Sequence, residues 1–259
     1  MKDKWKNMAP VVALAALMTL GPVAQASTTA AGRYDSEIQA SVVQKLEKDS
    51  DFQNVRSTVE DGIVTLTGKV QTLKDKLDAA KQVRKSSKQV NGVRNLIEVT
   101  STVPDSELFN QLSKRLAHDR VGWADNAFNA IHLAVKDGVV TLSGQVMDYP
   151  AYNSALAEAQ SMKGVKEVVN NLNVLPASPY DDQLRARLYR AIYGDNSLSK
   201  YALDPVRPIK IIVDRGKIGL YGKVDSEFDK TIAGMRAGQV FGGFSVENHL
   251  TTPNQVAVR

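Results

Sequence analysis

One twelve-residue segment occurs three times in this chain. "VEDGIVTLTGKV" at residues 59–70 returns as "VKDGVVTLSGQV" at 135–146 and as "VDRGKIGLYGKV" at 213–224. The first glycine of each copy gives the spacing, which is 76 and then 78 residues between Gly62, Gly138 and Gly216. A repeat with such a period indicates tandem copies of one small structural unit. The 259 residues are therefore expected to form three domains.

Each copy of the segment predicts a β-hairpin. Asp-Gly or Arg-Gly stands between two runs of alternating apolar residues, which is typical of a two-residue turn with positive φ. With the turn at Asp137-Gly138, Val135 pairs with Val140, and the same register pairs Val213 with Ile218. A second glycine follows on the inward face, where we expect it to let a helix approach closely. A phosphate-binding loop is a poor alternative, because it needs clustered glycines just before a helix. These second glycines are Gly68, Gly144 and Gly222.

A helix is predicted before each hairpin and another after it. The first helix begins at an aspartate that suits the N-cap position, and its apolar residues recur every four positions. The second helix is expected near 71–88, 149–163 and 226–237, followed by a last strand such as "VRNLIEV". This order predicts an α+β fold with domains at 35–102, 105–176 and 180–252. The three aspartates are Asp35, Asp105 and Asp181.

An asparagine stands on the apolar face of each predicted last strand. A buried amide must find hydrogen-bond partners, and these are most often nearby backbone groups. We therefore expect a structural contact that fixes the start of the strand. A ligand contact shared by the three domains is the alternative. The residues are Asn95, Asn170 and Asn248.

The first 26 residues have the features of a secretory signal peptide. Lysines precede an apolar stretch too short to span a bilayer, and Ala24-Gln25-Ala26 suits signal peptidase. Cleavage would leave Ser27 as the first residue, followed by a linker at 27–34, and would place the protein in the periplasm. An uncleaved membrane anchor is the alternative. A C-terminal tail is expected at 253–259. The sequence has no cysteine, so it offers neither a disulfide nor a lipoprotein attachment site.

The composition argues against nucleic-acid binding and metal chemistry. The formal net charge is +5, and it falls to +3 without the three lysines and one aspartate of residues 1–26. That excess is too small for the concentrated basic face of a nucleic-acid-binding protein. The histidines, at positions 118, 132 and 249, lack the spacing of a metal pair, and no motif joins a nucleophile to a base. We expect no catalytic residue, no metal and no cofactor.

The G-x-V-x-L-x-G core of the hairpin and the V-x-N-x-L-x-V last strand resemble the BON domain family (bacterial OsmY and nodulation). The resemblance extends over three tandem domains and nearly all of residues 27–259. It implies αββαβ modules, each with a three-stranded mixed sheet and two helices packed on one face. It also implies attachment to phospholipid membranes without catalysis, as proposed for periplasmic stress proteins. The third copy departs from the pattern at Gly219, at Thr251-Thr252, and by the long loop "YGDNSLSKYALDPVRP".

Two sets of residues are candidates for contact with lipid. The first is four lysines of the first domain, which recur at 0, +7, +11 and +14 and would fall within one arc of its second helix. They suit an anionic membrane surface, although a solvated helix face gives the same pattern. The second set lies in the loop "HDRVGWADNAF", where interfacial aromatic residues and residues that cap a core both fit. The candidates are Lys74, Lys81, Lys85, Lys88, Trp123 and Phe128.

These features together predict a secreted, non-enzymatic envelope protein. Its three modules would associate with anionic phospholipid surfaces, in envelope maintenance or in osmotic and envelope stress. The alternative is a periplasmic adaptor or chaperone-like protein that binds other envelope proteins. An enzyme is a weaker third hypothesis, because no residue pattern supports one.

Overall fold

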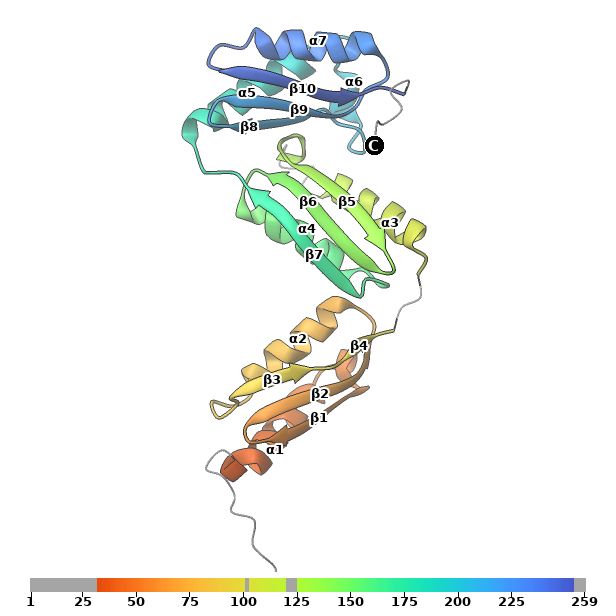
Figure 1. Ribbon diagram of the computed structural model, residues 1–259, viewed down its shortest axis with the longest axis vertical. Coiled ribbons are helices and arrows are strands. Elements are labelled where there is room, and N and C mark those ends of the chain that lie inside the picture. The colour runs from red at the N-terminus through yellow and green to blue at the C-terminus, as the bar shows by residue number, and fades with distance from the viewer. Residues whose placement is uncertain (1–31, 101–102, 120–124, 254–259) are drawn as a thin grey trace, which may run out of the picture.

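The computed structural model describes residues 32–100, 103–119 and 125–253, which form three domains in a row (Figure 1). The predicted signal peptide, most of the linker and most of the C-terminal tail lie outside these residues. Each domain has the order helix, strand, strand, helix, strand, so the predicted fold is confirmed.

The elements of each domain are as follows. The first has α1 (Asp35–Leu46), β1 (Val55–Glu60), β2 (Ile63–Val70), α2 (Leu73–Arg84), β3 (Gly92–Asn95) and β4 (Glu98–Val99). The second has α3 (Asp105–His118), β5 (Ala130–Lys136), β6 (Val139–Val146), α4 (Tyr149–Ser161) and β7 (Glu167–Val174). The third has α5 (Pro179–Tyr193), α6 (Lys200–Leu203), β8 (Lys210–Asp214), β9 (Lys217–Lys223), α7 (Glu227–Gly238) and β10 (Ser245–Thr251). Short 3-10 turns are η1 (Gly32–Tyr34), η2 (Ser50–Phe52) and η4 (Asp125–Phe128).

Each sheet has the second hairpin strand at its centre. The orders are β1-β2-β3, with β4 also paired to β2, then β5-β6-β7 and β10-β9-β8. The hairpins are antiparallel and the last strand is parallel to the central one, so the second helix supplies the crossover that a parallel neighbour needs. The predicted register is confirmed, since Val135 pairs with Val140 and Val213 with Ile218. The turn residues Asp137 and Gly138 have φ values of 55° and 79°.

The two helices of each domain bury a stripe of residues on one side of its sheet. In α1 the stripe is Ile38, Val42 and Leu46, which are all buried, as their fourfold spacing predicts. The second helices bury alanines, which let the helix axis lie close to the sheet. A domain of about 70 residues buries too little surface to be more than marginally stable alone. We therefore expect contacts between domains to contribute to stability.

The aspartates at the start of the first helices are not N-caps, so this prediction was wrong. Other residues occupy the cap positions. Each aspartate instead reaches the hairpin turn of its own domain, where Asp181 accepts hydrogen bonds from the backbone N of Arg215 and of Gly216, both at 2.9 Å. The carboxylate thereby satisfies turn N–H groups that have no strand partner. Asp35 and Asp105 hold their turns in the same way.

The second glycine of each copy permits a close approach between strands, and not the helix approach that we predicted. Gly144 has a φ of 111°, and a Cβ there would lie 2.1 Å from the carbonyl oxygen of Ala130 on the neighbouring strand. Glycine is required because side chains rarely adopt this φ and because the space is already filled. Gly68 and Gly222 occupy the same position in the other domains, against the carbonyl oxygens of Asn54 and Pro208.

Neighbouring domains pack on one another. Leu73, at the start of α2, belongs to the same buried cluster as Leu108 of α3 and the rest of the core of the second domain. Ala127 of η4 belongs to the core of the third domain. Lys210 of β8 is half-buried at the same boundary and donates a hydrogen bond of 2.7 Å to the backbone oxygen of Asn126. The short linkers thus join domains that share buried side chains.

The third domain accommodates its departures from the family pattern. Its long loop carries Leu198 and Tyr201 into the core, and α6 forms within it. Gly219 leaves room for the ring of Tyr221, which would lie 2.7 Å from a Cβ at that position. That ring packs against a small buried cluster that joins Ala130 and Leu175 of the second domain to Ile212 of the third. The last strand, β10, stays paired to β9 as far as Thr251.

Candidate functional site

The four candidate lysines of the first domain are all exposed, but they do not share one helical face. α2 begins with a capping box between Thr72 and Asp75 and ends at Arg84. The prediction that this helix reaches residue 88 was wrong, since α2 ends at Arg84 and the hydroxyl of Ser86, beyond the C-cap, donates a hydrogen bond to the backbone oxygen of Val83. Lys74 and Lys81 lie on the helix, Lys85 is its C-cap, and Lys88 lies in the turn that follows.

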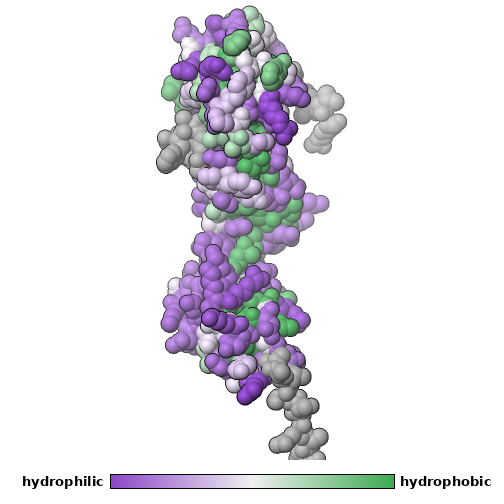
Figure 2. Space-filling view, turned by 90° about the vertical axis from the view of Figure 1, so that its left-hand side faces the viewer, coloured by the Kyte–Doolittle hydropathy of each residue, from purple (hydrophilic) through white to green (hydrophobic). Residues whose placement is uncertain are grey.

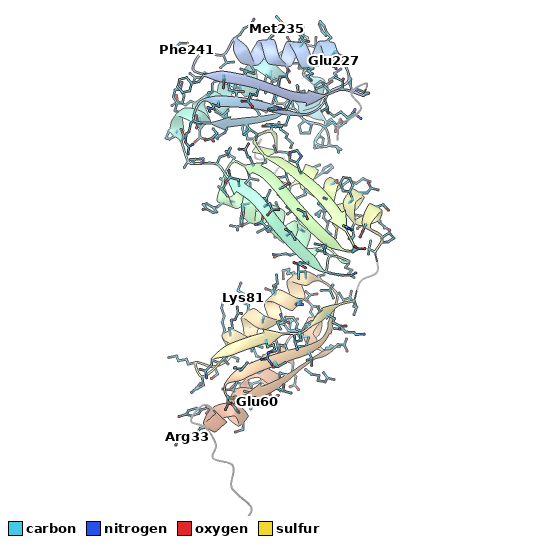
Figure 3. The ribbon with its side chains drawn as sticks, viewed as in Figure 1. Arg33, Glu60, Lys81, Glu227, Met235 and Phe241 are labelled. Carbon is cyan, nitrogen blue, oxygen red and sulfur yellow. The ribbon has the colours of Figure 1, made fainter. Side chains whose placement is uncertain are left out.

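A groove between the end of α1 and the side of α2 brings two further lysines to this surface. Its volume is about 670 Å³. Lys45 and Lys48 come from the last turn of α1 and the residues after it, and Lys81 and Lys85 come from α2. We call these four residues the lysine groove. Figure 3 shows Lys81 on α2, and the side of the first domain that faces the viewer in Figure 2 is mainly hydrophilic.

The lysine groove keeps a positive excess. Its lining contains four lysines and two aspartates, Asp49 and Asp78, for a formal net charge of +2. Asp78 is already paired outside the groove, since its carboxylate accepts a 2.6 Å hydrogen bond from Lys74, and this bond raises the pKa of that lysine. Within the described ranges, none of the four groove lysines forms an ion pair. Their ammonium groups are therefore available to an external anion, with three donors on each.

The candidate aromatic residues differ in what the structure shows of them. Trp123 lies outside the described residues. Phe128 is half-buried against the core of the third domain, and its ring centroid lies 6.0 Å from that of Tyr189 in an edge-to-face contact. The alternative interpretation, that Phe128 caps a core, describes this position. A side chain held between two domains is not free to contact a membrane.

The three asparagines tie the last strand to the second helix. The amide nitrogen of Asn95 donates to the backbone oxygen of Lys76 at 2.7 Å, and its oxygen accepts from the backbone N of Ile97 at 3.2 Å. Asn248 makes the same two kinds of contact in the third domain. Asn170 differs, because its amide donates to the hydroxyl of Tyr152 at 2.6 Å. These side chains are half-buried and have protein partners, which is the geometry of a structural contact.

The described part of the chain shows no group of three histidine, cysteine, aspartate or glutamate side chains placed to hold a metal ion. Among those same residues, no helix is long and apolar enough to cross a membrane. An ionic network in the third domain joins Lys200 to Asp225 and Asp229, each at 3.0 Å, and Tyr201 to Asp229 at 2.7 Å. It fixes α6 and the long loop against the start of α7, which is a structural task.

Sequence reasoning found half of the lysine groove. Lys81 and Lys85 were candidates because they recur on a predicted helix. Lys45 and Lys48 were missed, although "KLEK" at the end of the first helix shows two basic residues there. Nothing in the local pattern states that the end of α1 lies beside α2, 36 residues along the chain from Lys45 to Lys81.

The BON domain family model matches residues 34–101, 105–176 and 180–254, and the chain belongs to this family. The family is associated with osmotic and envelope stress proteins, is generally found in the periplasm or envelope, and is generally non-enzymatic.

No curated protein matches the chain. Two solved structures of CdsD, a structural protein of the type III secretion system of Chlamydia trachomatis, are similar at 14% identity. One covers 85% of this chain and 92% of its own, with a TM-score of 0.23. The other, of the C-terminal domain, covers 82% and 96%, with a TM-score of 0.24. Scores at this level carry no argument about function.

Proposed function

We propose that this protein is a periplasmic, non-enzymatic envelope protein that associates with anionic phospholipid surfaces through the lysine groove of its first domain. The observation that carries the proposal is the convergence of Lys45, Lys48, Lys81 and Lys85 from two helices onto one exposed surface. Lysines near an anionic leaflet contribute about 1 kcal/mol each to binding. Export by a cleaved signal peptide at residues 1–26 belongs to the same proposal.

Flotation of purified residues 27–259 with phosphatidylcholine vesicles containing graded phosphatidylglycerol tests the proposal. The quadruple variant K45Q/K48Q/K81Q/K85Q keeps long side chains and helix propensity but removes four charges. We expect it to lose up to about 4 kcal/mol of attraction, roughly a thousandfold in partitioning, and less where salt screens the surface. Its melting temperature should stay unchanged because all four side chains are exposed.

A matched control removes the same number of charges elsewhere. K114Q/K136Q/K163Q/K166Q changes four exposed lysines of the second domain, so the net charge of the two variants is equal. We expect this control to float nearly as well as the parent protein. Equal losses in both variants would show that only net charge matters. Binding that ignores lipid charge would reject the proposal and favour the adaptor alternative.

A further inference from the structure

The loop between α7 and β10 of the third domain exposes two phenylalanines. Phe241 is 91% exposed and Phe244 is 78% exposed, the first being the most exposed large apolar side chain among the described residues. Figure 3 places Phe241 at the end of the third domain, where α7 gives way to β10, and Figure 2 shows hydrophobic side chains on the surface of that domain. A side chain left this exposed contributes almost nothing to folding through burial.

The other two domains show what this loop needs structurally. The backbone N of Phe244 donates to the oxygen of Gly216 at 2.8 Å, and the backbone N atoms of Asn91 and Lys166 donate to the equivalent turn glycines at 2.9 Å. These three residues therefore occupy one position of the fold. In the first two domains the side chain there also donates to a carbonyl oxygen of the turn, from Asn91 to Asp61 and from Lys166 to Asp137.

The third domain gives up that polar contact. The ring of Phe244 lies on Gly216, and a Cβ atom added to this glycine would be only 2.6 Å from a carbon of the ring. Three residues earlier, where the third domain has Phe241, the first two domains have Lys88 and Lys163. Both positions are thus polar in two copies of the domain and phenylalanine in one. The fold is the same in all three, so its geometry does not require phenylalanine.

The residues around the two rings indicate the kind of partner that would bind them. Arg215, with a side chain 79% exposed, is in the turn beneath Phe244, and Lys217 is exposed beside Ser245. Asp214 lies 4.0 Å from Arg215, so these three residues leave a net charge of +1. Both rings are largely exposed on a loop between a helix and a strand, so a partner without a fixed shape fits them. Exposed aromatic residues beside cationic ones match the boundary between anionic headgroups and acyl chains.

We infer that the Phe241–Phe244 loop inserts into the interfacial region of an anionic bilayer and forms a second membrane contact in the third domain, distinct from the lysine groove. Tyr180 supports the loop from α5, since its hydroxyl donates to the backbone oxygen of Gly242. The inference rests on the proposed function only in that both need a bilayer. The lysine groove supplies charge attraction that salt weakens, whereas inserted rings supply apolar burial that salt does not weaken.

The test uses residues 27–259 and vesicles of phosphatidylglycerol and phosphatidylcholine. F241K/F244N installs the residues that the first domain has at these positions. We expect the partition coefficient at high salt to fall about tenfold for each phenylalanine removed, with an unchanged melting temperature. L203N is the control, because Leu203 is 85% exposed in α6, at the other end of this domain (Figure 1). It should bind like the parent, and equal binding by F241K/F244N overturns the inference.

A fluorescent reporter shows insertion directly. Trp123 is the only tryptophan of residues 27–259, so F244W in a W123F background places a single tryptophan in the loop. We expect a blue-shifted emission and quenching by lipids with brominated acyl chains. A bound protein whose tryptophan remains unquenched overturns the insertion while leaving the lysine groove intact.

The groove variant separates the two proposals. K45Q/K48Q/K81Q/K85Q should need more lipid to bind, yet its reporter should still be quenched once it is bound. Loss of quenching in the bound groove variant would mean that the loop does not insert by itself. A parent protein that binds neither neutral nor anionic vesicles rejects both the proposed function and the insertion.

Discussion

Replacing Asp181 by asparagine tests whether a helix-borne carboxylate holds the hairpin turn. Asp181 is 2% exposed and accepts from two turn N–H groups, those of Arg215 and Gly216. Asparagine has one acceptor oxygen and an NH₂ group in place of the other, so D181N keeps at most one bond. A hydrogen bond to a charged group is worth about 1.5–3 kcal/mol. The amide of Gly216 is buried, so water cannot replace the lost acceptor.

We therefore expect D181N to lower the free energy of unfolding of the third domain by about 2–3 kcal/mol. With a slope of about 1–2 kcal/mol per molar urea for a domain of this size, the midpoint should fall by about 1–3 M. D35N is the matched comparison, because the turn at Asp61 is exposed and water can take over there. Its cost should be about half as large.

Amide hydrogen exchange measures the contact between Asp181 and the turn at the level of single residues. In D181N, the amides of Arg215 and Gly216 should exchange faster, while those of the first two domains keep their parental rates. Circular dichroism of the native state should be unchanged, since the helix has its own cap at Ser178. If exchange at the turn is unaltered, or if D35N and D181N cost the same, the carboxylate does not hold the turn as described.

Two further changes probe the asparagine contact and the boundary between domains. Asn170→Leu should cost about 1–3 kcal/mol in urea unfolding, because the backbone N of Leu172 loses its acceptor, and unchanged stability with lost vesicle binding would instead identify a ligand residue. Burial lowers the pKa of Lys210 to about 8, below the value of about 10.4 in the unfolded chain, so the unfolded state binds more protons between these pH values. The parent should therefore gain stability relative to K210M as pH rises from about 8 to about 10, by at most roughly 1.4 kcal/mol per pH unit, and a difference that does not change with pH would contradict this.

Features that depend on residues close together in the chain could be predicted from the sequence, and features that depend on distant residues could not. Hairpin register came from the alternation around Asp137-Gly138, and the buried stripe of α1 came from residues four apart. Such periodic patterns indicate which side of a helix or strand is buried, so a segment of about a dozen residues is enough to recognise them. The end of α2 was harder to predict, because the apolar pattern does not mark the point at which the helix ends, Arg84.

The sequence by itself determined three tandem α+β domains, their element order and the hairpin turns, because these depend on local spacing and on the repetition of one pattern. The tertiary structure alone decided the partners of residues far apart in the chain. Asp181 contacts a turn 34 and 35 residues away, Lys45 lies across a groove from Lys81, and Phe128 packs against the core of the next domain. It also showed that Phe241 and Phe244 stand exposed where equivalent positions are polar. The sequence shows that a residue is apolar but not whether it is buried, so only the packing of the folded chain distinguishes a core side chain from a surface one.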